Sequence, residues 1–304
     1  MSAAWVAGSV RARAMARRRL GVANARVLAG GDLAAALTML AASPYQPVSP
    51  GSSLAEAQRR VAETLLWHLR VLAGWLPADG AQLLRLLAGW YEIANVEEHL
   101  QALSGAAAEP PYQLGTLATA WPRLAGTGSP AELRAALTAS AWGDPGGSDP
   151  RTISLTMRLV WAERVASRVT TARTWARGAA ALLVARERLA AGRRLPDRAA
   201  ALATRLLGTG WSHAGTVPEL AAAVPPAAGW ALAGVSEPAG LWTAEARWWR
   251  RLREQGESLL ATGGFGTDRV VGAVAVLAAD AHLVRAALEL AARGGDREVL
   301  DALA

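Results

Sequence analysis

The stretch "LAEAQRRVAETLLWHLRVLAGW", from Leu54 to Trp75, carries the clearest structural signal in the chain. Its apolar residues recur every three or four positions, the spacing that places side chains on one face of an α-helix. Ser53 precedes the stretch and Glu56 stands at the third helical position, so the start has the pattern of a capping box. The stretch predicts an amphipathic helix whose apolar face packs against the rest of the protein.

The same helical spacing extends over most of the chain. Runs of β-branched residues are scarce, and no segment alternates apolar and polar residues as a half-buried strand does. We therefore expect an all-α protein. Long helices are predicted at 5–29, 54–76, 80–104, 152–191, 197–207, 241–261 and 267–293, and short ones at 32–42, 130–140 and 217–224.

One phrase occurs three times. "GDLAAALTMLAASPY", which begins at Gly31, is followed by "PAELRAALTASAWGD" from Pro130 and by a shorter relative, "PELAAAV", from Pro218. The second and third copies stand at the same spacing after a glycine that ends a long predicted helix. Repeated helical units usually bury their apolar stripes against one another. We therefore expect three similar helical bundle units with pseudo-threefold character in one compact structure, spanning 1–105, 106–192 and 193–304.

The amino-acid composition excludes several kinds of functional site. The chain has 304 residues, 52% of them hydrophobic and 19% charged, as in a folded protein. It contains no Cys, and all 32 basic residues are Arg, so thiolate metal sites, disulfides, Schiff bases and the lysine of a phosphate-binding loop are absent. None of the four His has a partner at metal-ligand spacing. The sequence predicts no catalytic residue, no metal site and no cofactor.

The first 31 residues contain no acid and carry a series of arginines. A transit peptide, a helix on a membrane surface, a partner contact and a solvated face are all compatible with this pattern. The longest uninterrupted apolar runs, such as the one from Val270 to Ala279, are about half of the roughly 20 residues that cross a bilayer, so we expect no membrane span. The candidate partner-contact residues are Arg11, Arg13, Arg17, Arg18 and Arg19.

A second basic stretch, "ARWWRRLRE", interleaves arginine with tryptophan. This combination suits stacking on single-stranded nucleic acid, although one of two adjacent tryptophans on a helix normally faces the core. An Arg/Trp-rich helical nucleic-acid-binding protein is therefore the alternative function, and a helical enzyme with an unrecognised site is a third. The residues of this patch are Arg247, Trp248, Trp249, Arg250, Arg251 and Arg253.

The stretch "LLRLLAGWYEIANVEEHLQAL", from Leu83 to Leu103, resembles a helix of the central-stalk adaptor family of V-type and A/V-type rotary ATPases, designated C, or d in eukaryotes. In that family an acidic residue, an aliphatic residue, any residue and Asn lead into a long helix, and here Glu92, Ile93 and Asn95 hold those places. The usual Asp is Glu92 in this chain. The segment 204–224 and the closing stretch from Val270 are similar to later parts of the family, so the resemblance spans nearly the whole chain.

The resemblance implies an all-α funnel of three three-helix units with no active site. Such an adaptor links the membrane rotor ring to the central shaft, so that torque couples ATP hydrolysis or synthesis to ion transport. The implied partners are the proteolipids of the rotor ring and the proteins of the central shaft, and no small-molecule substrate. The implied location is the cytoplasmic face of a membrane, held there indirectly through these partners.

Overall fold

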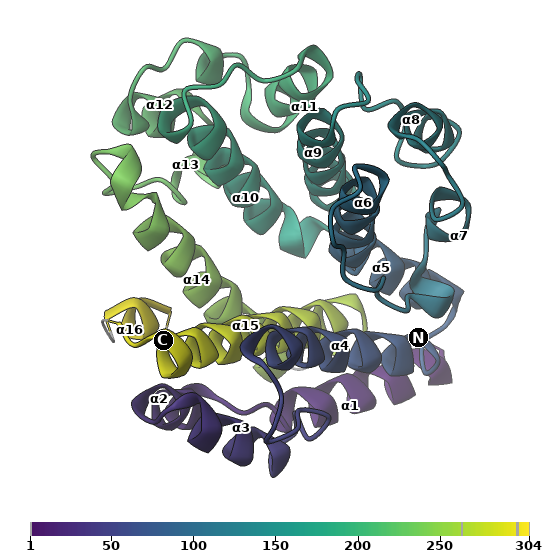
Figure 1. Ribbon diagram of the computed structural model, residues 1–304, viewed down its shortest axis with the longest axis vertical. Coiled ribbons are helices and arrows are strands. Elements are labelled where there is room, and N and C mark those ends of the chain that lie inside the picture. The colour runs from purple at the N-terminus through teal and green to yellow at the C-terminus, as the bar shows by residue number, and fades with distance from the viewer. Residues whose placement is uncertain (1, 263, 296–297, 304) are drawn as a thin grey trace. The chain divides into compact units, whose positions relative to one another are not determined.

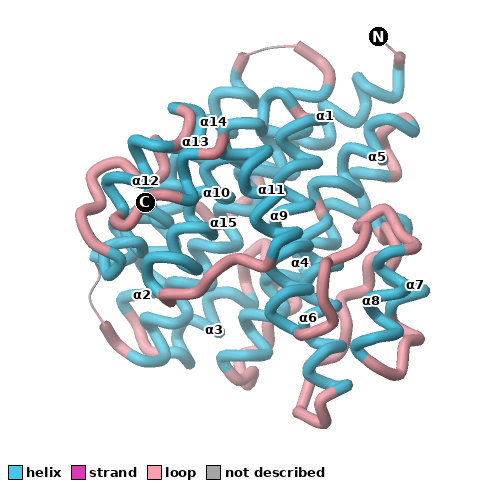
Figure 2. The backbone as a smooth tube through the Cα atoms, turned by 90° about the horizontal axis from the view of Figure 1, so that it is seen from above, coloured by secondary structure: helices cyan, strands magenta, loops and turns pink. Residues whose placement is uncertain are grey.

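The computed structural model describes residues 2–262, 264–295 and 298–303. Within these ranges every regular element is helical and no strand occurs, which confirms the expected all-α class (Figure 2). In chain order the α-helices are α1 (Ala3–Arg17), α2 (Val22–Gly30), α3 (Leu33–Ala41), α4 (Leu54–Ala73), α5 (Ala78–Leu87), α6 (Gly89–Leu103), α7 (Trp121–Leu124), α8 (Pro130–Thr138), α9 (Pro150–Arg168), α10 (Arg173–Ala185), α11 (Asp197–Leu207), α12 (Val217–Ala223), α13 (Pro226–Gly229), α14 (Leu241–Ala261), α15 (Thr267–Arg293) and α16 (Glu298–Leu303).

The helix predicted from the first stretch is present as α4, and its capping box is complete. The Ser53 hydroxyl accepts a hydrogen bond from the Glu56 N–H, and the Glu56 carboxylate accepts one from the Ser53 N–H at 2.7 Å. The bond from the Ser53 N–H, followed by one from the Ser53 hydroxyl to the same carboxylate, lowers the pKa of Glu56 below its ordinary value. The cap fixes where α4 begins because it satisfies backbone donors that a helix start otherwise leaves unpaired.

The three short helices predicted from the repeated phrase are α3, α8 and α12, and each begins with a side-chain cap. The residue before each helix accepts a hydrogen bond from the backbone N–H three positions on. The three capping residues are Asp32, Ser129 and Thr216. The division of the chain into three repeats at 105 and 192 stays a prediction.

Three predicted long helices are interrupted. The prediction of one helix over 5–29 was wrong at 18–21, where the N–H groups of Leu20 and Gly21 bond the carboxylate of Asp280 in α15. Gly21 adopts a φ of 81°, a conformation that side chains with a Cβ rarely take. A carboxylate far away in the sequence thus takes two donors that would have continued the helix.

The other two interruptions lie inside 80–104 and 152–191. Between α5 and α6 the indole of Trp161 donates to the Leu86 carbonyl at 2.8 Å and packs so closely on Gly89 that a Cβ there would lie 2.7 Å from the ring. Between α9 and α10 the chain turns at Val169, and Arg173 donates to the Ala166 carbonyl at the end of α9. A π-helical turn, η3 (Arg186–Ala190), follows α10.

The helices in Figure 1 belong to two compact units, residues 1–81 with 246–304 and residues 82–245. In the first unit α15 is the central helix, because it packs against α1, α2, α3, α4 and α16. In the second unit α9 packs against α6, α10 and α11, and α10 also packs against α13. The first unit is therefore assembled from both ends of the chain.

Helix α15 corrects the expectation that no segment is long and apolar enough to cross a membrane. By length and composition alone Thr267–Arg293 meets that requirement, and 83% of its most apolar stretch is buried inside the protein. Polar residues such as Asp280 interrupt its apolar runs, so counting uninterrupted runs underestimated it. The core helix of a soluble protein has the same composition, so α15 is weak evidence for a span.

Candidate partner-binding surfaces

The residues that carry the family resemblance lie on α6, and all three are buried. One oxygen of the Glu92 carboxylate accepts from the Thr119 N–H at 2.6 Å, and the other accepts from the Ala120 N–H at 2.8 Å and the Trp142 indole at 2.7 Å. Ile93, at 4% exposure, is part of the surrounding core. Glu92 therefore fastens the turn before α7 and the segment after α8 onto α6.

Asn95, one turn further along α6, holds the loop that follows this helix. Its amide accepts from the Tyr112 N–H at 2.6 Å and donates to the Tyr112 carbonyl at 3.0 Å. With Glu92 it fixes the path of the chain between α6 and α7. The geometry assigns both residues a structural role, since neither presents a polar group to solvent.

A second carboxylate of the same kind lies in α15 of the other unit. Asp280 is 3% exposed and accepts hydrogen bonds from the Leu20 N–H, the Gly21 N–H and the Tyr45 hydroxyl at 3.0, 2.8 and 2.9 Å. Burial raises the pKa of Asp280 although these bonds and Arg19 act against it. Sequence reasoning missed this residue, and the signal that marks it is an acid within an otherwise apolar helix.

The two buried carboxylates are held in the same way. Each lies on a long helix, accepts hydrogen bonds from two consecutive backbone N–H groups of a turn, and accepts a third bond from an aromatic residue in one copy of the repeated phrase. That aromatic residue is Tyr45 in the first copy and Trp142 in the second. After the third copy Trp230 packs instead on Gly178 of α10, where a Cβ would lie 2.8 Å from the indole. In all three cases an aromatic residue within or shortly after the repeated phrase therefore contacts a longer helix.

The candidate contact residues of the first helix divide into two groups. Arg13, Arg17 and Arg18 are exposed and make no ion pair with any described residue. Arg19 bonds the Ala16 carbonyl and pairs with Glu257 at 2.8 Å, so it fixes the end of α1 within the unit. The guanidinium of Arg11 lies 5.8 Å from the centre of the Trp75 ring. Only the first group, with Arg11 at its edge, is free to meet a partner.

The Arg/Trp patch lies on α14, and its side chains interact mainly with the protein itself. Trp248 and Trp249 are half-buried, and Trp249 stacks on His282 with ring centres 4.1 Å apart and planes 10° from parallel. Burial, followed by the charge of Arg285, lowers the pKa of His282 to about 4. One face of Trp249 is therefore already covered by a neutral imidazole, which weakens the case for stacking on bases. Of the four arginines, Arg250 pairs with Glu254, and Arg251 and Arg253 also interact with other residues. Arg247 is half-buried, and its buried Nη2 has no hydrogen-bond partner among the described residues.

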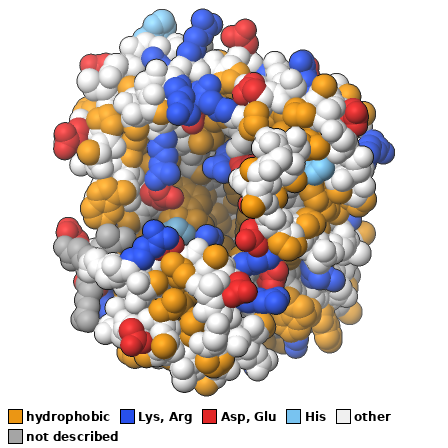
Figure 3. Space-filling model, viewed as in Figure 1, with side chains coloured by type: hydrophobic (Ala, Val, Ile, Leu, Met, Phe, Trp, Pro, Cys, Tyr) orange, Lys and Arg blue, Asp and Glu red, His pale blue; other side chains and the backbone are white. Residues whose placement is uncertain are grey.

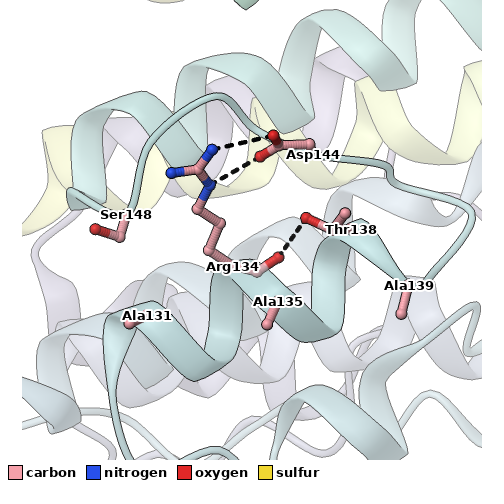
Figure 4. A pocket seen from close by; sticks show the side chains of 7 residues that line it. All are labelled: Ala131, Arg134, Ala135, Thr138, Ala139, Asp144 and Ser148. Atoms are coloured by element: carbon pink, nitrogen blue, oxygen red, sulfur yellow. Dashed lines mark hydrogen bonds and ion pairs between the residues drawn. The ribbon is translucent and has the colours of Figure 1, made fainter.

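A shallow recess of about 500 Å³ lies beside α8 (Figure 4). Arg134 points across it to Asp144, and the two side chains form a bidentate ion pair at 2.9 and 3.0 Å. This pair, reinforced by the Gly146 N–H, lowers the pKa of Asp144 to about 2. The other lining residues are mostly alanines. Among the described residues, the only charged side chains that line the recess are therefore Arg134 and Asp144, which neutralise each other.

On the face shown in Figure 3, basic side chains are mixed with hydrophobic ones. Within the described ranges no three His, Asp or Glu side chains gather in a way that could hold a metal ion. No protein-family model matches the chain, and no curated protein matches it. The exposed part of α1 is thus the best-defined candidate for contact with another molecule.

Proposed function

We propose that this protein is a non-catalytic adaptor in the central stalk of a V/A-type rotary ATPase, which links the membrane rotor ring to the central shaft. The proposal rests on the resemblance of the stretch around Glu92, Ile93 and Asn95 to the central-stalk adaptor family. The buried role of these side chains supports it, because a motif that builds the fold can persist where surface residues differ. In this proposal the three repeated units form a funnel that receives the shaft.

The similar hydrogen bonding of the two buried carboxylates gives the adaptor proposal further support. Glu92 and Asp280 hold turns that each precede a copy of the repeated phrase, as expected if the chain contains copies of one helical unit. A repeated helical scaffold that exposes arginines and encloses its own polar groups suits an adaptor, whose work is to hold partners in place. The chemistry of the described residues offers no competing active site with comparable definition.

Affinity capture tests the proposal. The tagged protein is recovered from gently solubilised membranes of its own host, with a tagged unrelated helical protein as the control, and the recovered proteins are quantified by mass spectrometry. We expect ring proteolipids and shaft proteins in constant ratio to the bait. Purification of the intact rotary ATPase without this protein would overturn the proposal, and nuclease-sensitive recovery of nucleic acid would favour the Arg/Trp alternative.

A further inference from the structure

Helix α1 presents two distinct faces. With about 100° between successive residues, Gly8, Ser9, Ala12, Met15 and Ala16 share one arc, and all five are buried. Val10, Arg13, Ala14 and Arg17 share the opposite arc, and all four are exposed. The buried arc packs into the first unit, so the helix is already anchored and its outer arc remains open.

The outer arc continues onto α4. Arg11 and Arg18, seven residues apart, stand at the edge of the arc, and both charges help to lower the pKa of His68 after the larger effect of burial. Arg11 also lies over Trp75, two residues beyond the end of α4, and the backbone carbonyl of Trp75 is 3.3 Å from where a Cβ of Gly8 would be. The two helices therefore form one continuous surface.

Two indoles protrude from that surface. Trp67 and Trp75 are 53% and 50% exposed, and Val10 is 55% exposed. The described residues include six exposed large hydrophobic side chains, and these are three of them. Tryptophan is enriched at protein interfaces and at membrane–water interfaces, and clustered exposed apolar side chains mark such sites. We call this set the α1–α4 surface, formed by Arg11, Arg13, Arg17, Arg18, Trp67 and Trp75.

The charged members of the α1–α4 surface are all arginines. Helix α1 contains no acid, and Glu63, the acid nearest to Trp67 on α4, is engaged by Arg59 and Arg60. Arg13, Arg17 and Arg18 have no acidic partner among the described residues. Guanidinium groups match phosphate oxygens in two-pronged hydrogen bonds. A phosphate-bearing surface is therefore the complement of this face.

We propose that the α1–α4 surface binds the headgroup layer of an anionic phospholipid membrane. Indoles prefer the boundary between headgroups and acyl chains, and arginine stems can lie along apolar matter while their charges reach phosphates. The surface is less suited to stacking on nucleic-acid bases, because Arg11 lies over the Trp75 ring and the Trp67 ring meets His68 edge-on, with ring centres 5.2 Å apart. The inference goes beyond the adaptor function, since it gives this face a lipid contact in place of a protein contact.

The test uses the purified full-length chain and vesicles of phosphatidylcholine with or without phosphatidylglycerol, followed by flotation. We expect binding only to the vesicles with phosphatidylglycerol, and a decrease as salt screens the charges. Each exposed arginine contributes about fivefold to such binding, so Arg13→Ala with Arg17→Ala should weaken it about 30-fold. Because the outer arc packs on nothing, the double variant should melt at the same temperature as the parent.

A matched variant controls for net charge. Arg168→Ala with Arg193→Ala removes two exposed charges from the second unit, and it should leave vesicle binding within about twofold. Trp67→Ala should weaken binding about tenfold, whereas Trp242→Ala, which removes another exposed indole, should not. Equal losses in both arginine pairs, equal binding to neutral vesicles, or retention of single-stranded oligonucleotides without binding to vesicles would each overturn the proposal. Since no other protein is present, the result is independent of the adaptor function.

Discussion

Asp280 joins three distant parts of the first unit at a single carboxylate. An amide at this position offers one acceptor oxygen for the Leu20 N–H, the Gly21 N–H and the Tyr45 hydroxyl, and its NH₂ would face donors. We expect Asp280→Asn to lower the free energy of unfolding by about 2–4 kcal/mol. Urea denaturation monitored by circular dichroism measures this loss.

Two further variants define the origin of that loss. Tyr45→Phe removes one of the three donors and should cost about 1 kcal/mol, while Glu254→Gln changes an exposed acid on α14 and should change little. If Asp280→Asn were no more damaging than Glu254→Gln, the hydrogen bonds at Asp280 would contribute nothing measurable to stability.

His282 gives the first unit a dependence on pH. Its pKa is lowered to about 4 from an ordinary 6.5, so between these values the unfolded chain binds more protons than the folded one. Stability therefore rises with pH across that window, by about 3 kcal/mol in total. His282→Phe keeps a ring against Trp249 and removes this dependence. Denaturation of both proteins at several pH values measures it, and parallel profiles would contradict it.

The comparison between the parent protein and His282→Phe also separates the effect of His282 on stability from that of Asp280. The pKa of Asp280 is raised, so its contribution has the opposite sign and falls as pH rises through its folded pKa. Asp280 is present in both proteins, and its contribution cancels in the difference. Only the change caused by His282 remains.

At the scale of the helices, sequence patterns predicted those helix boundaries that depend on interactions between neighbouring residues. The capping box of Ser53 and Glu56 and the caps of the three short helices involve residues three positions apart, so the sequence exposes them directly. The breaks at 18–21 and 88 depend on Asp280 and Trp161, which lie far along the chain. No local pattern distinguishes a helix that continues from one whose backbone donors are taken by a distant side chain.

Helices α14 and α15 pack with their backbones close together, and this contact requires glycine. A Cβ on Gly272 would lie 2.8 Å from the Gly256 carbonyl oxygen and 2.8 Å from the Leu259 Cβ. Gly272→Ala should therefore destabilise the protein by about 1–3 kcal/mol, despite the better helix propensity of alanine. Thermal unfolding measures the effect. Gly51→Ala is the control, because nothing lies within 4 Å of its added Cβ, and an equal effect in both would exclude a steric cause.

At the scale of the whole molecule, the sequence predicted the all-α class but not the grouping of helices. The repeated phrase drew attention to α3, α8 and α12, whereas the packing groups α1 to α4 with α15 from the far end of the chain. The candidate site residues were likewise identified only in part from the sequence. Composition identified the arginines of α1, but only the packed structure separates Arg19, which is paired internally, from Arg13 and Arg17, which are exposed.

The second unit is continuous in the sequence and should fold by itself. We expect a fragment of residues 82–245 to be helical and to unfold cooperatively, because its core helices α9, α10 and α11 pack within it. A fragment of residues 1–81 should remain largely unfolded, since it lacks α15. Circular dichroism and thermal denaturation of both fragments test this expectation. A fragment 1–81 that folded cooperatively would show that α15 is not needed for its core.

The discontinuity of the first unit has a consequence for synthesis on the ribosome. Helices α1 to α4 emerge early, but the helix that covers their apolar faces is translated only after the whole second unit. At about 5–20 residues per second, those faces remain uncovered for roughly ten seconds or more. Nascent chains therefore pass through a stage in which the second unit is complete and the first is not, and chaperones that bind exposed apolar segments should associate with the N-terminal part until α15 has been translated.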